Sequence, residues 1–476
     1  MVRSRREFVT AAGATLATSV VMDRLQGAND RVTLGFIGVG VMGQVNLALA
    51  MKEPGVQVAA ICDVYRPNLE RAEAAAQKEG HRPKTCKDFR DILADKSIDA
   101  VCISAPDHWH ALMTVEACKA GKDVYVEKPV CSFIDEAPIV IRAARQYKRV
   151  VQGGVQSRSS GHMPAVRQVI DSGQLGEVTF VRVWDYSLEH REGIGHPPDE
   201  APPAELDWDL WLGPAPQRPF NQNRFQTQRG AWSAFRYYWD YAGGRLTDNG
   251  VHLFDLLQMA FRETAPTAVV SLGGKRYLRD SRETPDTQVC LYEYPEFLMS
   301  YEHRYANAQS MIGKSSGILV HGTRGTLFFG RPPAYQVYAE RDAALPPVNP
   351  VGTLPQVISD KVTQLGFLGG ARLVPVGSGV ASTIGGPAES PKPSVSQSFQ
   401  ASQSHWANFL ECVRTRQKPV GDIEYAARSS VTGLLGNVAL LSKVRVEYDP
   451  ANWTSSQSEV RAFMSYHYRA PWKLEI

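Results

Sequence analysis

The stretch VTLGFIGVGVMGQVNLALA, residues 32–50 of this 476-residue chain, decides the fold. Its first six residues form an apolar, strand-like run, and its last part carries apolar residues at helical spacing. Between them, Gly38, Gly40 and Gly43 make a G-x-G-x-x-G turn that leads from the strand into the helix. The stretch predicts the first strand, turn and helix of an open parallel sheet with a phosphate-binding turn.

The same alternation of strand and helix continues to about residue 155. Apolar runs such as VQVAAICD, AVCIS, DVYVEK and RVVQGG are separated by helical stretches, which indicates crossover units and a doubly wound parallel sheet. Polar sequence follows four of these strands, at Asp63, at Pro106–His110, at Glu127–Pro129 and at Gln152–Arg158. Because the carboxyl ends of parallel strands line one crevice, we expect these segments and the glycine turn to form one ligand site.

The position of Asp63 indicates which ligand the crevice takes. It follows Gly43 by twenty residues, the spacing of an acid that binds the ribose hydroxyls of a dinucleotide. A carboxylate there repels a 2′-phosphate and favours NAD, although the nearby Arg66 leaves NADP possible. The alternative interpretation is three turn glycines and a solvated aspartate. The turn residues expected to bind the cofactor are Gly38, Gly40, Val41, Met42 and Gly43.

Composition limits the possible partners. A net charge of +3 is nearly neutral for this length and gives no electrostatic reason to expect nucleic acid or membrane binding. The hydrophobic content of 43% and the length suit a two-domain globular protein. The seven cysteines form no CxxC pair, so we expect neither a metal site nor redox chemistry from them.

Residues 1–30 are predicted to be an export signal. Ser4–Val9, SRREFV, matches the twin-arginine motif, and the mildly apolar stretch that follows is too short and too weak for stable membrane insertion. The alternative is an ordinary basic amphipathic start. The motif predicts export by the Tat machinery, and therefore a periplasmic or otherwise exported protein.

The chain changes character after residue 155, and residues 156–450 are expected to form a second α/β domain. Residues 187–240 are rich in proline and tryptophan, which suits an active-site wall whose aromatic faces contact sugar rings. Several strand-like runs between residues 267 and 329 have few helices between them and predict a mainly antiparallel, open sheet. Residues 350–400, rich in Gly, Ser and Pro, indicate a flexible insertion, and residues 451–476 a carboxyl-terminal extension.

The segment GGRLTDNGVHLFD contains a candidate catalytic pair. Asp248 and His252 are four residues apart, so on a regular helix they share a face and can touch. A histidine oriented by a carboxylate is suited to act as a general base. The alternative is an aspartate that caps the helix and a histidine satisfied in the core.

Taken together, GFIGVGVMG, the PDHWH loop, EKP at Glu127–Pro129, GGRLTDNGVHLFD and HWANFLECVRTRQKPV resemble the Gfo/Idh/MocA oxidoreductase family. The resemblance extends from Val32 to about Pro450, apart from the insertion. It implies NAD, a sugar, polyol or sugar-derivative substrate, and an open sheet that forms the interface of a dimer or tetramer. It also implies a cis peptide bond at Pro129, a catalytic Lys128 and a functional Asp248–His252 pair.

In the implied reaction, His252 takes the hydroxyl proton while Lys128 stabilises the developing alkoxide, and the two roles can be exchanged. Pro106, His110 and Glu127 are expected beside Lys128 in the cofactor pocket. The residues expected to contact the substrate are Gln156, Arg158, Trp184, Tyr237 and His303.

Export limits the supply of free cofactor to such an enzyme. Free nicotinamide nucleotide is scarce outside the cytoplasm, so the cofactor must be loaded before export, stay bound and be recycled. The first alternative is an NAD-dependent glycoside hydrolase that works by transient oxidation and elimination. The second is a sugar-binding protein without turnover.

Overall fold

The computed structural model describes five stretches of the chain. The expected export signal, residues 1–30, and residues 350–394 of the expected insertion lie outside the described residues. Residues 395–400 are helical, because they begin the long amphipathic helix α12 (Val395–Thr415). The described residues are 31–188, 192–225, 233–331, 334–340 and 395–476.

The amino-terminal half forms the predicted doubly wound parallel sheet. Its strand order is β3-β2-β1-β4-β5-β6, and every neighbouring pair is parallel. The order reverses between β1 and β4, where the loops after the strands open a crevice. The three-residue strand β3 escaped prediction because it has no apolar run. The strands are β1 (Val32–Ile37), β2 (Val56–Cys62), β3 (Lys84–Cys86), β4 (Ala100–Ile103), β5 (Asp123–Val126) and β6 (Val151–Gly153), and the helices are α2 (Val41–Ala50), α3 (Arg66–Lys78), α4 (Phe89–Ala94), α5 (His110–Lys119) and α6 (Glu136–Gln146).

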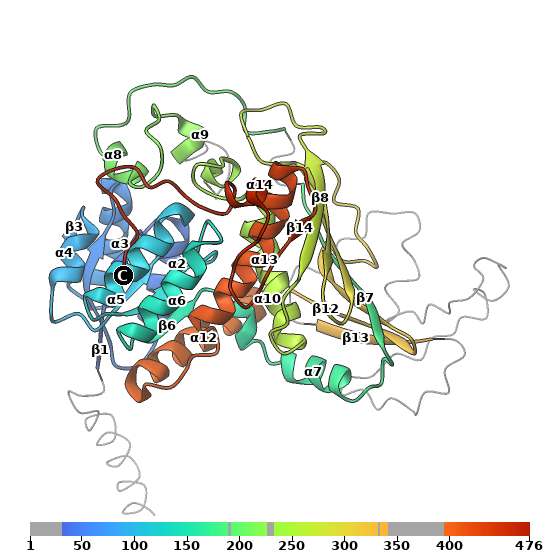
Figure 1. Cartoon of the computed structure of the whole chain (residues 1–476). Coiled ribbons are helices and arrows are strands. Elements are labelled where there is room, and N and C mark those ends of the chain that lie inside the picture. The colour runs from blue at the N-terminus through green and yellow to red at the C-terminus, as the bar shows by residue number, and fades with distance from the viewer. Residues whose placement is uncertain (1–30, 189–191, 226–232, 332–333, 341–394) are drawn as a thin grey trace, which may run out of the picture.

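The second sheet confirms the expectation of a mainly antiparallel arrangement. It has eight strands in the order β13-β12-β11-β7-β10-β9-β8-β14, and only β7 and β10 pair in parallel. Helices α10 and α13 lie between this sheet and the first half of the molecule (Figure 1). The strands are β7 (Val178–Tyr186), β8 (Ala268–Gly274), β9 (Thr287–Glu293), β10 (Leu298–Arg304), β11 (Ser316–Gly322), β12 (Gly325–Gly330), β13 (Ala334–Ala339) and β14 (Val446–Glu447), and the helices packed near them are α7 (Met163–Asp171), α10 (Val251–Ala260) and α13 (Ile423–Ser442).

Helix α12 returns to the first half of the molecule and completes its core. The Trp406 ring stacks on Tyr125 with centroids 4.4 Å apart and lies 6.2 Å from the ring of Phe36. His405, one residue earlier, bonds through Nε2 to the carbonyl of Gly153 at 2.9 Å. The core of the first half therefore depends on residues that come more than two hundred positions later in the chain.

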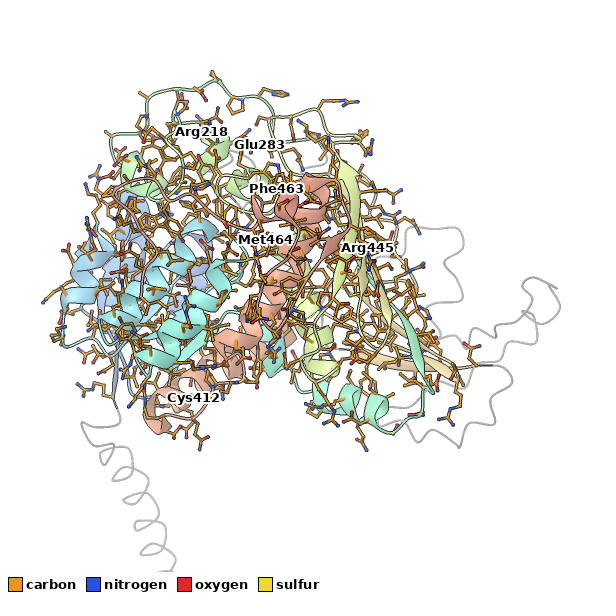
Figure 2. The ribbon with its side chains drawn as sticks, in the orientation of Figure 1. Arg218, Glu283, Cys412, Arg445, Phe463 and Met464 are labelled. Atoms are coloured by element: carbon orange, nitrogen blue, oxygen red, sulfur yellow. The ribbon has the colours of Figure 1, made fainter. Side chains whose placement is uncertain are left out.

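The end of the chain also crosses back to the first half. After α14 (Ser458–Arg461), Met464 is buried between the two halves, and its carbonyl accepts a hydrogen bond from the backbone N–H of Asp135 at 3.2 Å (Figure 2). Farther along, Trp472 packs edge-on against Trp109, with ring centroids 4.8 Å apart. None of the described helices has the length and apolar composition that crossing a bilayer requires.

Candidate active site

The glycine turn has the geometry that a dinucleotide requires. Gly38 has a φ of +78°, and a Cβ there would lie 2.6 Å from the backbone nitrogen of Ala105. A Cβ on Gly43 would lie 2.1 Å from the carbonyl oxygen of Gly38, so neither position accepts a side chain. At Gly40 a Cβ would have only Asn68 nearby, at 3.8 Å, because this glycine borders an open cavity. No side chain caps the start of α2, so the backbone at this helix end is accessible to a ligand phosphate.

Asp63 lies at the end of β2 and lines the same cavity. Its carboxylate accepts hydrogen bonds from the N–H groups of Val39 at 2.8 Å and Tyr65 at 2.9 Å. Burial raises the pKa of this carboxyl group, and these two hydrogen bonds oppose the rise. Arg71 and Lys87 also border the cavity, so cationic groups stand near the acid.

The same cavity is lined by Arg236, which comes from the second half of the molecule. Of the predicted cofactor residues, Val41, Met42 and Pro106 line it with Gly38 and Gly40. Aromatic side chains from both halves form much of its wall. They are Phe89 and Trp109 from the first half, and Trp211, Phe225 and Phe235 from the tryptophan-rich segment.

The tryptophan-rich segment is held onto the dinucleotide-binding half by polar contacts. The carbonyl of Trp211 accepts a hydrogen bond from Trp109 Nε1 at 3.0 Å. Asp207 forms an ion pair with Lys87 at 2.7 Å. We call residues 205–225 and 233–241 the strap. It contains α8 (Trp208–Leu212) and α9 (Gln222–Phe225), which lie above the first half in Figure 1.

Two predicted pocket residues, Glu127 and His110, serve mainly to fix loops. Glu127 is buried and accepts hydrogen bonds from Asn46 Nδ2 at 2.9 Å and from Gln156 Nε2 at 3.2 Å. The ring of His110 lies within hydrogen-bond distance of the carbonyls of Pro129 and Ala105, at 2.6 and 2.8 Å. The side chain of Gln156, which was predicted to contact substrate, thus donates its hydrogen bond to Glu127.

Lys128 and Asp248 come together where the two halves meet. Lys128 Nζ donates to Asp248 Oδ1 at 2.5 Å and to the Asp248 carbonyl at 2.8 Å. Arg236 Nε donates to the same Oδ1 at 3.2 Å. These cations hold the pKa of Asp248 well below its usual range, against the effect of burial. The Lys128–Pro129 peptide bond is cis, in agreement with the resemblance.

The expected hydrogen bond between Asp248 and His252 is absent from the described residues, and that part of the prediction was wrong. Residues Leu246–Gly250 form a π-helical turn, whose i→i+5 hydrogen bonds replace the regular α-helix assumed from the sequence. Asp248 does not cap α10, which begins after Gly250 without a side-chain cap. His252 is nonetheless buried beside this cluster, with Nδ1 lacking a hydrogen-bond partner among the described residues.

The pKa of His252 is held well below its usual value. Burial is the main cause, and the positive charges of Arg331 and Lys128 lower it further, against the opposing charge of Asp248. The ring is therefore neutral near pH 7 and able to accept a proton. Because Lys128 and Asp248 both act on it, the three predicted catalytic residues share one region.

The sheet places His303 and Trp184 on opposite faces. His303 is in register with Asp185, and both are buried on the face that packs against α10 and α13. Trp184 precedes Asp185, so its side chain points to the other face, where it packs against Phe328. The structure therefore places Trp184, which was expected to contact the substrate, on the face of the sheet away from α10.

The side chains of Arg158 and Tyr237 are both held by contacts with charged residues. Arg158 is 4% exposed, donates to Asp255 Oδ1 at 2.7 Å and forms two hydrogen bonds with Glu263, so it stabilises the core instead of contacting substrate. Tyr237 lies next to Arg236, and the Arg282 guanidinium stacks on its ring at 4.6 Å.

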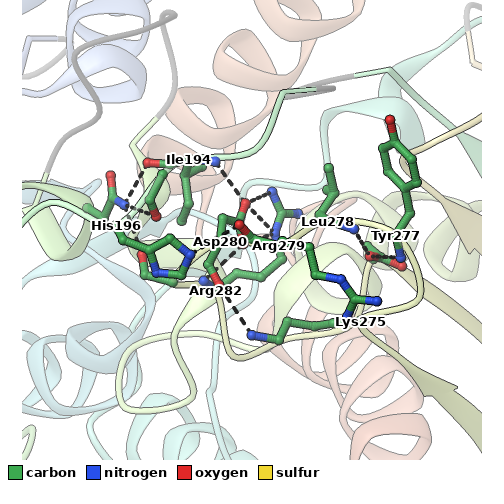
Figure 3. Close-up of polar contacts among 12 residues, drawn as sticks. Ile194, His196, Lys275, Tyr277, Leu278, Arg279, Asp280 and Arg282 are labelled. Atoms are coloured by element: carbon green, nitrogen blue, oxygen red, sulfur yellow. Dashed lines mark hydrogen bonds and ion pairs between the residues drawn. The ribbon is translucent and has the colours of Figure 1, made fainter.

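A loop cluster holds Arg282 in place. Asp280 accepts hydrogen bonds from Arg282 Nε at 2.8 Å and from the N–H of Ile194 at 2.8 Å (Figure 3). These contacts fix the loop between β8 and β9 against the segment that leads into the strap.

Sequence reasoning missed three cationic residues of this region, Arg236, Arg245 and Arg331. Arg245 is bonded to both carboxylate oxygens of Asp185, one of them at 2.9 Å. Arg245 stands inside the quoted GGRLTDNG segment, which was the available signal. Arg236 and Arg331 stand in no periodic pattern or motif.

Comparisons with known proteins agree with this architecture. A family model described as "Oxidoreductase family, NAD-binding Rossmann fold" matches residues 32–155, and two models of the family's carboxyl-terminal α/β domain match residues 161–276 and 219–349. The chain is 34% identical over 155 residues to an inositol 2-dehydrogenase of Salmonella typhimurium, an alignment that covers 32% of this chain and 45% of that protein.

Two further matches differ in kind. A glycosyl hydrolase family 109 protein of Saccharopolyspora erythraea is 33% identical over 160 residues, covering 32% of this chain and 34% of that protein. A solved levoglucosan dehydrogenase, in complex with NADH and levoglucosan, superposes with a TM-score of 0.58 at 18% identity, covering 88% of this chain and 99% of the other. The sequence alignments thus span less than half of these curated relatives, and the structural likeness concerns the fold.

Proposed function

Because the chain belongs to the Gfo/Idh/MocA oxidoreductase family, we propose that it is an NAD-dependent oxidoreductase acting on a sugar, a polyol or a sugar derivative. One observation carries the proposal. The cavity bordered by the glycine turn and Asp63 is also lined by Arg236, which shares Asp248 with Lys128. A dinucleotide in that cavity would therefore reach the ionisable cluster.

The residues of the chain have distinct tasks in this reaction. When bound, the nicotinamide ring supplies the two-electron redox chemistry. The neutral His252 ring accepts the proton of the substrate hydroxyl at a ring nitrogen. The ammonium group of Lys128 stabilises negative charge on the substrate oxygen, and Asp248 keeps it in position. In this scheme Asp248 orients the lysine, not the histidine.

The strap supports the proposal that the cofactor stays bound and is recycled. A ligand in the cavity lies beneath Trp211 and Phe235, which the contacts of Asp207 and of the Trp211 carbonyl hold against the first half. Retention is also what an exported enzyme needs, and Ser4–Val9 supports export by the Tat machinery to the periplasm. Asp63 supports NAD over NADP.

Two measurements test the function. The protein purified without added cofactor is expected to release a nicotinamide dinucleotide on denaturation, identified by mass spectrometry. A panel of sugars and polyols is then expected to change the nicotinamide absorbance of the undenatured protein. Protein that neither carries nor binds the dinucleotide would contradict the proposal.

A second candidate is an NAD-dependent glycoside hydrolase, favoured by the match to a glycosyl hydrolase family 109 protein. The same acid–base cluster would serve a cycle of oxidation, elimination and reduction. Incubation with aryl glycosides and no second redox substrate separates the two. Release of the aryl alcohol supports the hydrolase, whereas the oxidoreductase is expected to release none and to form an oxidised sugar when a second redox substrate is present.

The exposed face of the second sheet supports a homo-oligomer. Five large apolar side chains project from one region of this face, with Leu272 at 80% exposed. Single exposed apolar residues are common, but a contiguous apolar patch of this kind indicates an interaction surface. We call this patch the apolar sheet face, and a second copy of the chain is its proposed partner. Its residues are Val270, Leu272, Val289, Leu291 and Leu298.

A further inference from the structure

A row of polar residues crosses the second sheet beneath α10. His303 in β10 is in register with Asp185 in β7, and Asp185 is in register with Ser316 in β11. At the end of β12, Gly330 lies against Gly317 and Ser316, so the next residue continues the row. That residue is Arg331.

Arg331 belongs on the face of the sheet that α10 covers. Side chains alternate along a strand, so Arg331 shares the face of Phe329, two residues before it. Phe329 is fully buried in the core cluster that includes Leu253 and Leu257 of α10. The same helix carries His252, and Arg331 is the charge that most strongly lowers the pKa of that histidine. Register and electrostatics agree that Arg331 stands beside His252.

The carboxylates that act on Arg331 are already bonded to other cations. Arg245 takes both oxygens of Asp185, and Lys128 and Arg236 share one oxygen of Asp248. The third carboxylate, Asp255, is bonded to Arg158 and to Ser429. Among the described residues, Arg331 itself forms no hydrogen bond or ion pair.

An unpaired guanidinium in such a place is costly. Arg331 is partly buried, and burial lowers the pKa of its guanidinium, although the charges of Asp185, Asp248 and Asp255 oppose the shift. The other cations of this region, Lys128, Arg158 and Arg245, each have a bonded carboxylate. A ligand that brings a negative charge would supply the partner that the Arg331 guanidinium lacks among the described residues.

We propose that Arg331 binds an oxyanion of the substrate, so that the substrate class is an acidic sugar carrying a carboxylate or a phosphate. The inference rests on the proposed oxidoreductase function and narrows its substrate. The planar fork of a guanidinium matches either oxyanion with paired hydrogen bonds. The phosphates of the cofactor are not the ligand in question, because the glycine turn that receives them lies in the other half of the molecule.

The position of Arg331 also couples substrate binding to the chemistry. Arg331, Lys128 and His405 act on His252 to lower its pKa, and Asp248 acts to raise it. An oxyanion on Arg331 offsets the largest of these charges, so His252 becomes a better base when the substrate is seated. Binding of an acidic sugar would thereby raise the pKa of His252, the residue that accepts its proton.

The test compares matched acids and neutral sugars on protein that carries its cofactor. Dissociation constants are measured by calorimetry for glucuronate, galacturonate and mannuronate, and for glucose, galactose and mannose, with inorganic phosphate as a competitor. At least one acid is expected to bind at least 10-fold more tightly than its parent sugar. Arg331→Gln is expected to weaken that acid roughly 10- to 100-fold and to leave the neutral sugar unchanged. Arg331→Lys should recover part of the loss, and Arg182→Gln, on an exposed side chain of β7, is the control.

The outcomes separate this inference from the function on which it rests. Competition by inorganic phosphate points to phosphorylated sugars, and its absence points to sugar acids; both support the oxyanion site. If no acid binds more tightly to the wild type than to Arg331→Gln, the inference is overturned, even where neutral sugars change the nicotinamide absorbance. If no sugar of either kind changes that absorbance, the proposed function fails as well. As a readout independent of turnover, Arg331→Gln is expected to raise the pKa of the His252 ring in a proton-resonance titration.

Discussion

At the scale of single residues, the site is organised by cations competing for few carboxylates. Asp248 is shared by Lys128 and Arg236, and Asp185 is taken by Arg245. Motifs in the sequence were sufficient to single out Lys128, Asp248 and His252. The partner of Asp248 could not be read from spacing, because a π-helical turn changes which residues face one another. Arg236 and Arg331 could not be found either, since only the folded chain brings them to the site.

Replacing Lys128 tests the residue that the cluster is built around. Lys128→Met is expected to lower kcat by at least about 100-fold, because the donor aimed at the reacting oxygen is lost. The cofactor should still co-purify, since the glycine turn and Asp63 are untouched. Lys84→Met is the matched control, with a side chain that is 85% exposed. Turnover of Lys128→Met equal to that of Lys84→Met would contradict the assignment.

His405 gives a pH dependence with a defined sign. Burial lowers its pKa to about 4, so the folded protein leaves the ring neutral at pH values where the unfolded chain, with a pKa near 6.5, binds a proton. The free energy of unfolding must therefore fall as the pH drops from about 6.5 to 4, by roughly 3 kcal/mol from this residue.

The contribution of His405 is isolated by difference. His405→Gln keeps an amide near the Gly153 carbonyl and the Ser159 hydroxyl, the two groups that bond to the histidine, but has no proton to gain. Urea unfolding of wild type and variant is compared at pH 7 and pH 4.5. The variant is expected to lose less stability between these values, and equal losses would show that His405 titrates normally in the folded state.

At the scale of elements, strands and helices followed from apolar periodicity, but the covering of the cavity did not. Residues 187–240 were expected to form a wall because of their tryptophans, and Trp211 and Phe235 do line the cavity. The attachment of the strap could not be foreseen. It depends on contacts such as that of Trp109 Nε1 with a carbonyl and that of Lys87 with Asp207, which leave no periodic pattern.

Weakening the strap is expected to release the cofactor. Trp211 stacks on Trp208 with ring centroids 4.7 Å apart and borders the cavity, so Trp211→Ala opens the wall. We expect cofactor dissociation to become at least about 10-fold faster, and Trp211→Phe, which keeps a ring, should have a smaller effect. Fluorescence of bound NADH during dilution measures the rate.

A control separates the strap from a general loss of stability. Trp453→Ala removes a tryptophan that packs on Arg428, away from the residues that line the cavity. Its cofactor dissociation should match that of the wild type. Equal rates in Trp211→Ala and wild type would show that the strap does not retain the cofactor.

At the scale of the whole molecule, the two sheets have different roles. The first is covered on both faces, whereas the second keeps the apolar sheet face exposed. The class of each sheet, parallel in the first half and mainly antiparallel in the second, was predictable, because strand spacing distinguishes crossovers from hairpins. The return of α12 and of the chain end to the first half was not predictable, since an amphipathic helix does not specify its partner.

A charge on the apolar sheet face is expected to separate the copies. Leu272→Glu with Leu291→Glu places two carboxylates where a partner would bury leucines, which are 80% and 51% exposed in the single chain. Sedimentation velocity should show the double variant as a monomer and the wild type as a dimer or tetramer. Leu188→Glu, at an exposed leucine outside the sheet, should leave the wild-type assembly intact. A monomeric wild type would contradict the proposal.

The stacking of Trp406 on Tyr125 affects how the protein is made. Synthesis proceeds from the amino terminus, so the nucleotide-binding sheet leaves the ribosome long before the helix that finishes its interior. Until that helix is synthesised, the aromatic side chains of Phe36 and Tyr125 lack their partner Trp406 and remain exposed as apolar surface. The nascent chain therefore needs shielding by a chaperone for most of its translation, and a fragment cut at residue 155 would aggregate instead of folding alone.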